Sequence, residues 1–296
     1  MSGPVGPADA RRMWQLFEPV HAVVYFAPQA RAAFEAAGLR GFWRGYFAGR
    51  VAAMGAVGPE VVTAVCHGFA PAHVARAVPD IWSRVTPAQA LAARAAGARA
   101  SLEAALAATG APATGPAGAA EAAELIGAAA AAVDTGGRAL AAATAAVPRP
   151  DGPLDAIWHA ATVLREHRGD GHVAALVAEG VTGLQALVLR AGADLDRALL
   201  QPARGWTDAQ WDAAVAVLAE RELVTAPRGQ DGVTTAAGRD LLARVEAVTD
   251  RLAAEPWTAL GRDGTERLAA LIGPLSAAAR GVLPVLTPIG LPPAPG

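Results

Sequence analysis

The fold is decided by residues 207–245, which read TDAQWDAAVAVLAERELVTAPRGQDGVTTAAGRDLLARV. Thr207 is a typical helix N-cap residue, and the apolar side chains that follow it recur at helical spacing as far as Glu222. Two short β-prone runs come next, at 223–225 and 232–235, and the Gly- and Asp-bearing segment between them favours a hairpin. Helical spacing returns from Ala236 to about Ala253. A helix, a two-stranded wing and a further helix predict a winged helix-turn-helix.

The rest of the chain also reads as helical. Hydrophobic residues, many of them alanine, make up 53% of the 296 residues, and aromatic residues only 5%. The Pro- and Gly-rich segment 148–153 is the clearest linker. We therefore expect a mainly α protein with a helical N-terminal domain over residues 1–147, a winged-helix domain over 148–283, and a Pro-rich tail, extended or mobile, over 284–296. An internal echo, His21-Ala22 against His159-Ala160, adds the alternative of a degenerate duplication.

Proline, glycine and capping residues predict where the other helices begin and end. The expected helices cover residues 9–17, 28–38, 41–50, 86–108, 119–133, 137–146, 154–168 and 264–280, with further starts at Pro59, Pro71 and Thr182. Pro19 either kinks the first helix or starts a new one. The helix that begins at 154 is expected to break at Arg168-Gly169-Asp170-Gly171.

The charged residues exclude several kinds of chemistry. All 25 basic residues are arginine, so a Schiff-base lysine or a P-loop lysine is impossible. The net charge of −2 gives no general attraction to nucleic acid or anionic lipid. A single cysteine excludes an internal disulfide and a multi-cysteine metal cluster. Since no signal peptide or membrane span is recognisable, we expect a cytoplasmic protein.

Half of the six histidines lie within residues 154–172. His159, Thr162 and Glu166 share one face of the predicted helix, and His167 is about a quarter-turn away. Three interpretations stay open: a weak metal site of His159, Glu166 and His172; acid–base chemistry by His159 or His167 with Arg168 binding a substrate anion; and structural capping alone. The catalytic residues and any cofactor are therefore unknown.

A second set of candidates lies in the N-terminal half. Gly41, Gly45 and Gly49 recur every four residues, which lets another segment approach that face. Arg44, Tyr46 and Arg50 accompany them and suit an anionic or aromatic ligand. The leading hypothesis is a small-molecule-binding protein with a pocket between its two halves, lined by His21, Arg44, Tyr46, Arg50, His159, His167, Arg168 and Trp206.

Two other functions compete with ligand binding. One is a ligand-responsive, DNA-binding transcriptional regulator, but Asp208 and Asp212 on the presumed reading helix would repel phosphates, and only Arg204 and Arg228 suit backbone contacts. The other is an enzyme that uses the histidine, arginine and aspartate residues of 159–172. The chain is expected to act as a monomer or a homodimer, with no membrane partner.

Several motifs resemble the actinobacterial SalK-like family of helix-turn-helix proteins. They are Glu18-Pro19-x-His21, the helix Gly41 to Arg50, Trp158 to Thr162, Leu164 to His172, Gly205-Trp206 and Thr235 to Arg239. The resemblance covers nearly the whole chain, and the His-Arg-Gly-Asp-Gly-His run is its most specific part. It implies a winged-helix architecture, an actinobacterial source and a link to natural-product genes, and it assigns no catalytic residue.

Overall fold

Helices provide nearly all of the regular structure, which confirms the mainly α prediction. The computed structural model describes residues 4–109, 115–225 and 232–294. The N-terminal elements are α1 (Pro7–Phe26), α2 (Pro28–Ala36), α3 (Phe42–Val51), a 3-10 turn η1 (Ala52–Met54), α4 (Pro59–Val65), α5 (Pro71–Ala75), α6 (Asp80–Arg84), α7 (Pro87–Thr109), α8 (Pro116–Ala131) and α9 (Ala139–Ala145). The C-terminal elements are α10 (Pro153–Ala178), α11 (Gly183–Ala191), α12 (Arg197–Arg204), α13 (Asp208–Glu220), β1 (Val224–Thr225), β2 (Val233–Thr234), α14 (Ala236–Leu252) and α15 (Glu255–Gly281).

The winged helix forms where the sequence predicts it. β1 and β2 pair antiparallel, with Val224 opposite Thr234, and the turn between them lies outside the described residues. Thr207 caps α13 by accepting from the Gln210 amide, and Thr182 caps α11 through Gln185 in the same way. The Thr234 hydroxyl donates to the Leu189 carbonyl oxygen at 2.7 Å. This bond fixes the wing against α11, so hairpin and helices form one unit.

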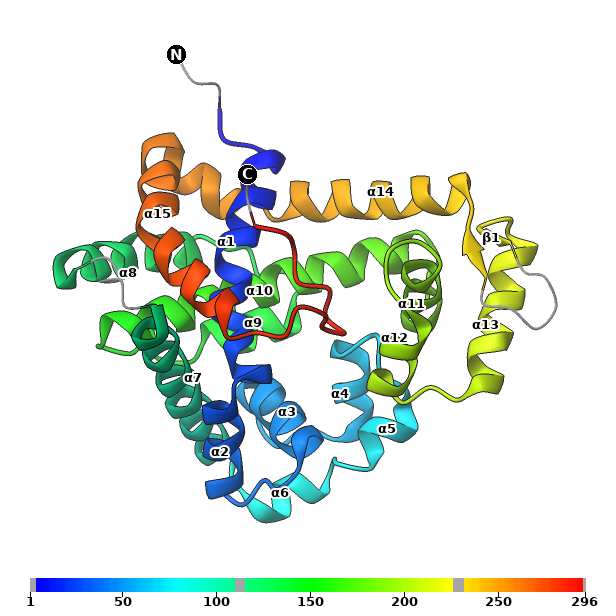
Figure 1. Ribbon diagram of the computed structural model, residues 1–296, viewed down its shortest axis with the longest axis horizontal. Coiled ribbons are helices and arrows are strands. Elements are labelled where there is room, and N and C mark those ends of the chain that lie inside the picture. Colours follow the sequence, from blue (N-terminus) through cyan, green and yellow to red (C-terminus); the bar gives the residue numbers. More distant parts are fainter. Residues whose placement is uncertain (1–3, 110–114, 226–231, 295–296) are drawn as a thin grey trace.

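Two hydrophobic cores share α10. The larger core contains side chains from α1, α2, α3, α7, α8 and the first half of α10, and α15 returns to it. The smaller core lies between α11, α13, α14 and the end of α10. The change from one core to the other falls within α10, between Leu164 and Ala175, and not at the linker 148–153. Figure 1 shows α10 and α14 reaching from the helical part to the winged helix. The division into domains 1–147, 148–283 and 284–296 stays a prediction.

The predicted break at 168–171 is wrong, because α10 is one continuous helix of 26 residues. Gly169 and Gly171 each cost a helix interior about 1 kcal/mol relative to alanine, which tertiary packing on both sides outweighs. Asp170, which lies inside α10, caps the start of a neighbouring helix. Its carboxylate accepts from the backbone N–H groups of Leu140 and Ala141, both at 3.0 Å, at the start of α9.

The N-terminal helices differ from the prediction in two details. α1 runs on to Phe26 with Pro19 inside it, well beyond residue 17. On α3, Gly45 and Gly49 let the Phe34 ring approach, since an added Cβ would lie 2.9 and 2.6 Å from that ring. Gly41 does not belong to this face, because it is the N-cap residue with a φ of 84°. The close approach that two of the three glycines allow brings α2 against α3.

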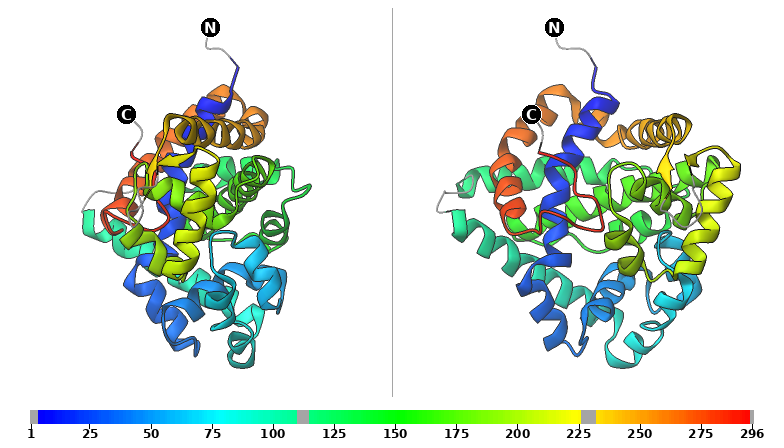
Figure 2. Two further views of the ribbon diagram at one scale, coloured as in Figure 1. Left: turned by 90° about the vertical axis from the view of Figure 1, so that its right-hand side faces the viewer. Right: turned by 45° about the vertical axis from the view of Figure 1, so that its right-hand side comes forward.

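The tail, predicted to be extended or mobile, has no helix or strand in its described residues but contains a turn, in which the Gly290 amide donates to the Thr287 carbonyl oxygen, and it is held in place. Arg204 donates to the Pro288 carbonyl oxygen at 2.8 Å, and Arg280 donates to the Pro292 carbonyl oxygen at 2.7 Å. Figure 2 shows this segment leaving α15, passing the winged helix and turning back across α1. It therefore covers part of the space between the two cores.

No single helix in the described part of the chain is both long and apolar enough to cross a bilayer. The helices α10 and α11 pass that test only as a pair, across a bend of 93°.

Candidate functional site

A cavity of about 220 Å³ lies between the helical core and the winged helix. It has roughly fifteen times the volume that one water molecule needs, so it can hold a small organic molecule. Its walls come from α3, the segment around α4 and α5, α10, α11, α12 and the tail. Its larger polar residues are Tyr46, Arg50, Cys66, His67, Arg165, His172, Arg190 and Arg204, and its larger apolar residues are Val65, Phe69, Val173, Leu176, Leu187, Leu195, Leu200 and Ile289.

Four arginines from four different helices reach this cavity. They are Arg50 on α3, Arg165 on α10, Arg190 on α11 and Arg204 on α12. Among its described lining residues there is no aspartate or glutamate. The wall is thus positively charged. Three of the four arginines pair with carboxylates that do not themselves line the cavity.

Glu166 is the carboxylate behind two of these arginines. It is completely buried, and its Oε2 lies 2.7 Å from Arg165 Nη1 and 3.2 Å from Arg50 Nη2. Burial alone would raise the pKa of Glu166, but the two guanidinium groups outweigh burial and hold that pKa far below its usual range. Glu166 is therefore ionised at neutral pH, and Arg50 and Arg165 both depend on it.

Arg204 differs from the other three because no carboxylate neutralises it within the described residues. Its guanidinium lies over the Phe69 ring at 4.4 Å and donates to the Pro288 carbonyl oxygen, while its Nε is buried without a partner. Burial lowers the pKa of Arg204. A desolvated cation without a counterion is costly, and an anion in the cavity would relieve that cost.

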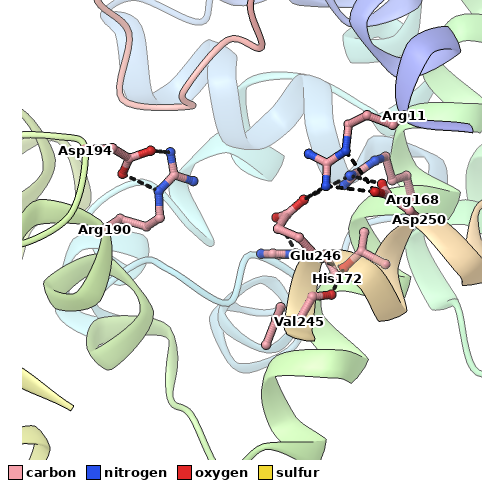
Figure 3. Close-up of polar contacts among 9 residues, drawn as sticks. Arg11, Arg168, His172, Arg190, Asp194, Val245, Glu246 and Asp250 are labelled. Atoms are coloured by element: carbon pink, nitrogen blue, oxygen red, sulfur yellow. Dashed lines mark hydrogen bonds and ion pairs between the residues drawn. The ribbon is translucent and has the colours of Figure 1, made fainter. Parts of the chain in front are cut away.

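A larger groove of about 700 Å³ adjoins the cavity, and His172 and Arg190 line both. On one side Arg190 forms a two-bonded pair with Asp194, at 2.7 and 2.8 Å (Figure 3). On the other side His172 Nδ1 lies 3.1 Å from the Thr249 hydroxyl and 3.5 Å from Glu246. Burial lowers the pKa of His172 to about 4, so the imidazole is neutral at pH 7 and its contact with Glu246 is not an ion pair there.

Arg168, a predicted ligand residue, lies in this second region and not at the cavity. Its Nη2 contacts Asp250 at 2.8 Å and Glu246 at 3.2 Å (Figure 3). Its guanidinium also lies 4.2 Å from the centre of the Trp14 ring. Arg11 contacts the same two carboxylates. This network joins α1 and α10 to α14, and so uses the charge of Arg168 for packing.

The histidines of the predicted site point to different places. His21 is fully buried between the Thr162 hydroxyl, 3.0 Å from Nδ1, and the Tyr25 hydroxyl, 2.9 Å from Nε2. His167 accepts from Arg138 at 2.6 Å, away from the cavity. His159 is half-buried and lines a separate small cavity beside α7.

The remaining predicted residues divide in the same way. Tyr46 and Arg50 line the cavity, and Arg50 donates to the Tyr46 hydroxyl at 3.1 Å. Arg44 points away and pairs with Asp80 at 2.8 Å. Trp206 is half-buried and donates to the Gly68 carbonyl oxygen at 2.9 Å, next to the cavity wall but not in it.

The metal candidates are not brought together. His159, Glu166 and His172 face the small cavity, the arginine pair and the groove, respectively. In the described residues no group of three histidine, cysteine, aspartate or glutamate side chains converges on a point that a metal ion could occupy.

Sequence reasoning missed most of the cavity wall. Arg190, Cys66 and His67 belong to no motif in the sequence analysis, Arg165 was named only within the Leu164 to His172 motif and not as a site residue, and Arg204 was considered only for DNA backbone contacts. The available signal was the absence of lysine together with several arginines in apolar surroundings, which says that some of them are buried but not which ones meet.

Gly183 controls how closely the winged helix approaches the cavity wall. Its Cα faces the His67 backbone, and a methyl group added there would overlap the His67 carbonyl oxygen. We expect Gly183→Ala to lower the free energy of unfolding by about 1–3 kcal/mol, as overpacking does, measured by urea denaturation. Gly127→Ala is the matched control, because its Cβ would meet only the Arg149 side chain, at 3.6 Å. Equal stability of the two variants would contradict the close packing of α11 against His67.

Comparison with known proteins adds one finding to this geometry. No curated protein and no solved structure gives a significant match to the chain. A family model described as a helix-turn-helix family matches residues 10–284, and the chain therefore belongs to that helix-turn-helix family.

Proposed function

We propose that this protein binds a small organic anion in the cavity between its helical core and its winged helix. The observation that carries the proposal is a wall with four arginines and, among its described residues, no acid. All of these residues come from one chain, so the site is complete in a single copy. Whether the protein is a monomer or a homodimer stays a prediction.

The roles of the lining residues follow from their charge balance. Arg50 and Arg165 share Glu166, and Arg190 has Asp194, whereas Arg204 has no carboxylate partner in the described residues. Arg204 is therefore the group that a ligand carboxylate would neutralise, by a charge-assisted hydrogen bond. Phe69, Leu176 and Leu187 offer apolar surface to the body of the ligand.

Isothermal titration calorimetry with matched probes tests the proposal. Benzoate, benzamide and benzylamine have similar size and shape but differ in charge, and we expect benzoate to bind best. Arg204→Gln keeps a donor for the Pro288 carbonyl but removes the charge. A hydrogen bond to a charged group is worth about 1.5–3 kcal/mol, so we expect roughly a 10- to 150-fold loss of benzoate affinity.

Arg40→Gln serves as the control for this titration, because Arg40 is exposed and lies outside the cavity wall. Its benzoate affinity should equal that of the wild type. Binding of benzamide or benzylamine as tight as that of benzoate, or an unchanged affinity in Arg204→Gln, would contradict the proposal.

The family favours a second candidate, a ligand-responsive DNA-binding regulator. The exposed surface of α13 argues against DNA reading by this helix. α13 contains no basic residue, and its Asp208 and Asp212 both pair with Arg197, at 2.7 and 3.2 Å. A gel-shift assay with the upstream DNA at two salt concentrations separates the candidates: tight binding that weakens steeply with salt would favour the regulator.

The source of the protein and its biological role are finer expectations of this proposal. The resemblance to the SalK-like family suggests an actinobacterial, cytoplasmic protein linked to natural-product metabolism, for which a small organic anion is a suitable ligand. The enzyme alternative has less support, because His159 faces the small cavity, His167 faces Arg138 and Arg168 faces the carboxylates of α14.

A further inference from the structure

Arg94 on α7 is a buried cation without a counterion in the described chain. It is 3% exposed, it forms no ion pair there, and its Nη2 is buried without a hydrogen-bond partner. Its one close partner is the Trp158 ring, 5.3 Å from the guanidinium carbon. A cation–π contact offsets only a small part of what the removal of a guanidinium from water costs. The structure thus leaves the charge of Arg94 largely uncompensated.

The guanidinium lies at a cavity of about 60 Å³, separate from the one between the cores. This is roughly four to six times the volume that one water needs, which suits a small anion and not a drug-sized molecule. The lining includes Thr144, Trp158, His159 and Thr162, and no acidic residue among those described. Pro148 and Pro150 of the linker form part of the wall, and His159 is half-buried. The cavity therefore has a side through which a small solute can enter.

The two buried carboxylates of α10, the helix that carries Trp158 and His159, are already paired. Asp155 forms a two-bonded pair with Arg99, and Glu166 is shared by Arg50 and Arg165. The positive potential of Arg94 acts on the other side chains of its cavity. After burial it is the main cause that lowers the pKa of His159, ahead of Arg149. In the described chain no carboxylate forms an ion pair with Arg94, and Glu166, whose pKa Arg94 helps to lower, interacts with it only at longer range.

We propose that this cavity binds a small monovalent anion, a halide or a short carboxylate, on the Nη2 of Arg94, with His159 beside it. The ion supplies the counter-charge that the chain does not. Neutral His159 has an N–H group to offer such an ion, and the Trp158 ring holds the guanidinium plane. This site is independent of the proposed ligand cavity, since Arg94 and His159 do not line that cavity.

Bromide tests the position of the site. In crystals soaked in sodium bromide, we expect an anomalous peak within hydrogen-bond distance of Arg94 Nη2. A cavity without bromide, with halide peaks only at the surface, would overturn the proposal.

Chloride tests the site in solution. When sodium chloride replaces sodium gluconate at constant ionic strength, we expect the wild-type Tm to rise by about 2 °C for each tenfold increase of chloride above its Kd. Acetate in place of chloride distinguishes a carboxylate site from a halide site. Arg94→Met removes the charge at similar volume and should abolish the rise, whereas Arg40→Met at the exposed surface should keep it. An equal rise of Tm with chloride in Arg94→Met and the wild type would also overturn the proposal. If Arg94→Met does not fold, the bromide soak decides.

Discussion

Glu166→Gln is expected to lower the free energy of unfolding by about 3–5 kcal/mol, the range for removal of one partner from a buried ion pair. Glu166 is completely buried, and its carboxylate is the shared partner of Arg165 and Arg50. Glutamine keeps the size and one acceptor oxygen but removes the negative charge. The guanidinium groups of Arg50 and Arg165 would then lose the counterion they share, and only Glu18, 3.9 Å from Arg165 Nε, would remain beside them, so the loss exceeds that of any single hydrogen bond.

The same substitution is expected to strengthen anion binding, which separates it from general damage. The cavity wall would gain one unit of positive charge, because Glu166 no longer neutralises Arg50 and Arg165. Urea denaturation measures the stability, and calorimetry with benzoate at a temperature where the variant is folded measures the affinity. Glu35→Gln, which breaks an exposed pair with Arg31, is the control and should cost less than about 1 kcal/mol. A loss as small as that of the control would show that the Glu166 cluster is not a coupled unit.

The winged helix was predictable because its signals are local. Thr182, Thr207 and Thr235 each cap a helix through an amide three residues further on, and the two short strands flank a Gly- and Asp-bearing turn. Such patterns define the start of a helix or strand within a few neighbouring residues. The proline-marked helix starts at Pro28, Pro59, Pro71 and Pro87 are correct for the same reason.

The break predicted in α10 shows where local reading fails. Gly169 and Gly171 weaken a helix in isolation, but here α10 is packed by both hydrophobic cores. An aspartate beside two glycines is typical of a helix N-cap, but the Asp170 carboxylate accepts from the first N–H groups of α9 and does not start a new helix. The energy that keeps α10 continuous comes from segments far away in the sequence.

The cavity was predictable only in part. Tyr46 and Arg50 were found because they lie on a helix with an unusual glycine spacing. Arg165 and Arg204 meet them across sequence separations that no periodicity encodes. His159, Thr162 and Glu166 do belong to one continuous helix, as predicted, but their side chains have different neighbours. His159 lines the cavity of Arg94, Thr162 contacts His21, and Glu166 pairs with Arg50. A common face on one helix does not make a common site.

Acidification is expected to destabilise the protein through His167 before the carboxylates titrate. Burial, and next the Arg138 guanidinium, lower the pKa of His167 to about 4, from an ordinary value near 6.5. Arg138 can only donate, so Nε2 of His167, 2.6 Å away, must be unprotonated in the folded state. Between pH 6.5 and 4 the unfolded chain therefore takes up a proton that the folded chain does not. The stability from this group is fully present above pH 6.5 and is lost as the pH falls toward 4, by as much as about 3 kcal/mol.

His167→Gln tests this sign directly, because an amide does not titrate. Urea denaturation at intervals between pH 7 and pH 4 should give a smaller decline for the variant than for the wild type, and the difference in slope should approach about 1.4 kcal/mol per pH unit. His67→Gln is the comparison, since His67 is less buried and burial shifts its pKa less. Parallel stability curves for His167→Gln and the wild type would contradict the assignment. They would mean that His167 takes up its proton at the same pH in the folded and the unfolded chain. Arg138 would then not donate to Nε2, and the contact between α10 and the N-terminus of α9 would differ from the one described.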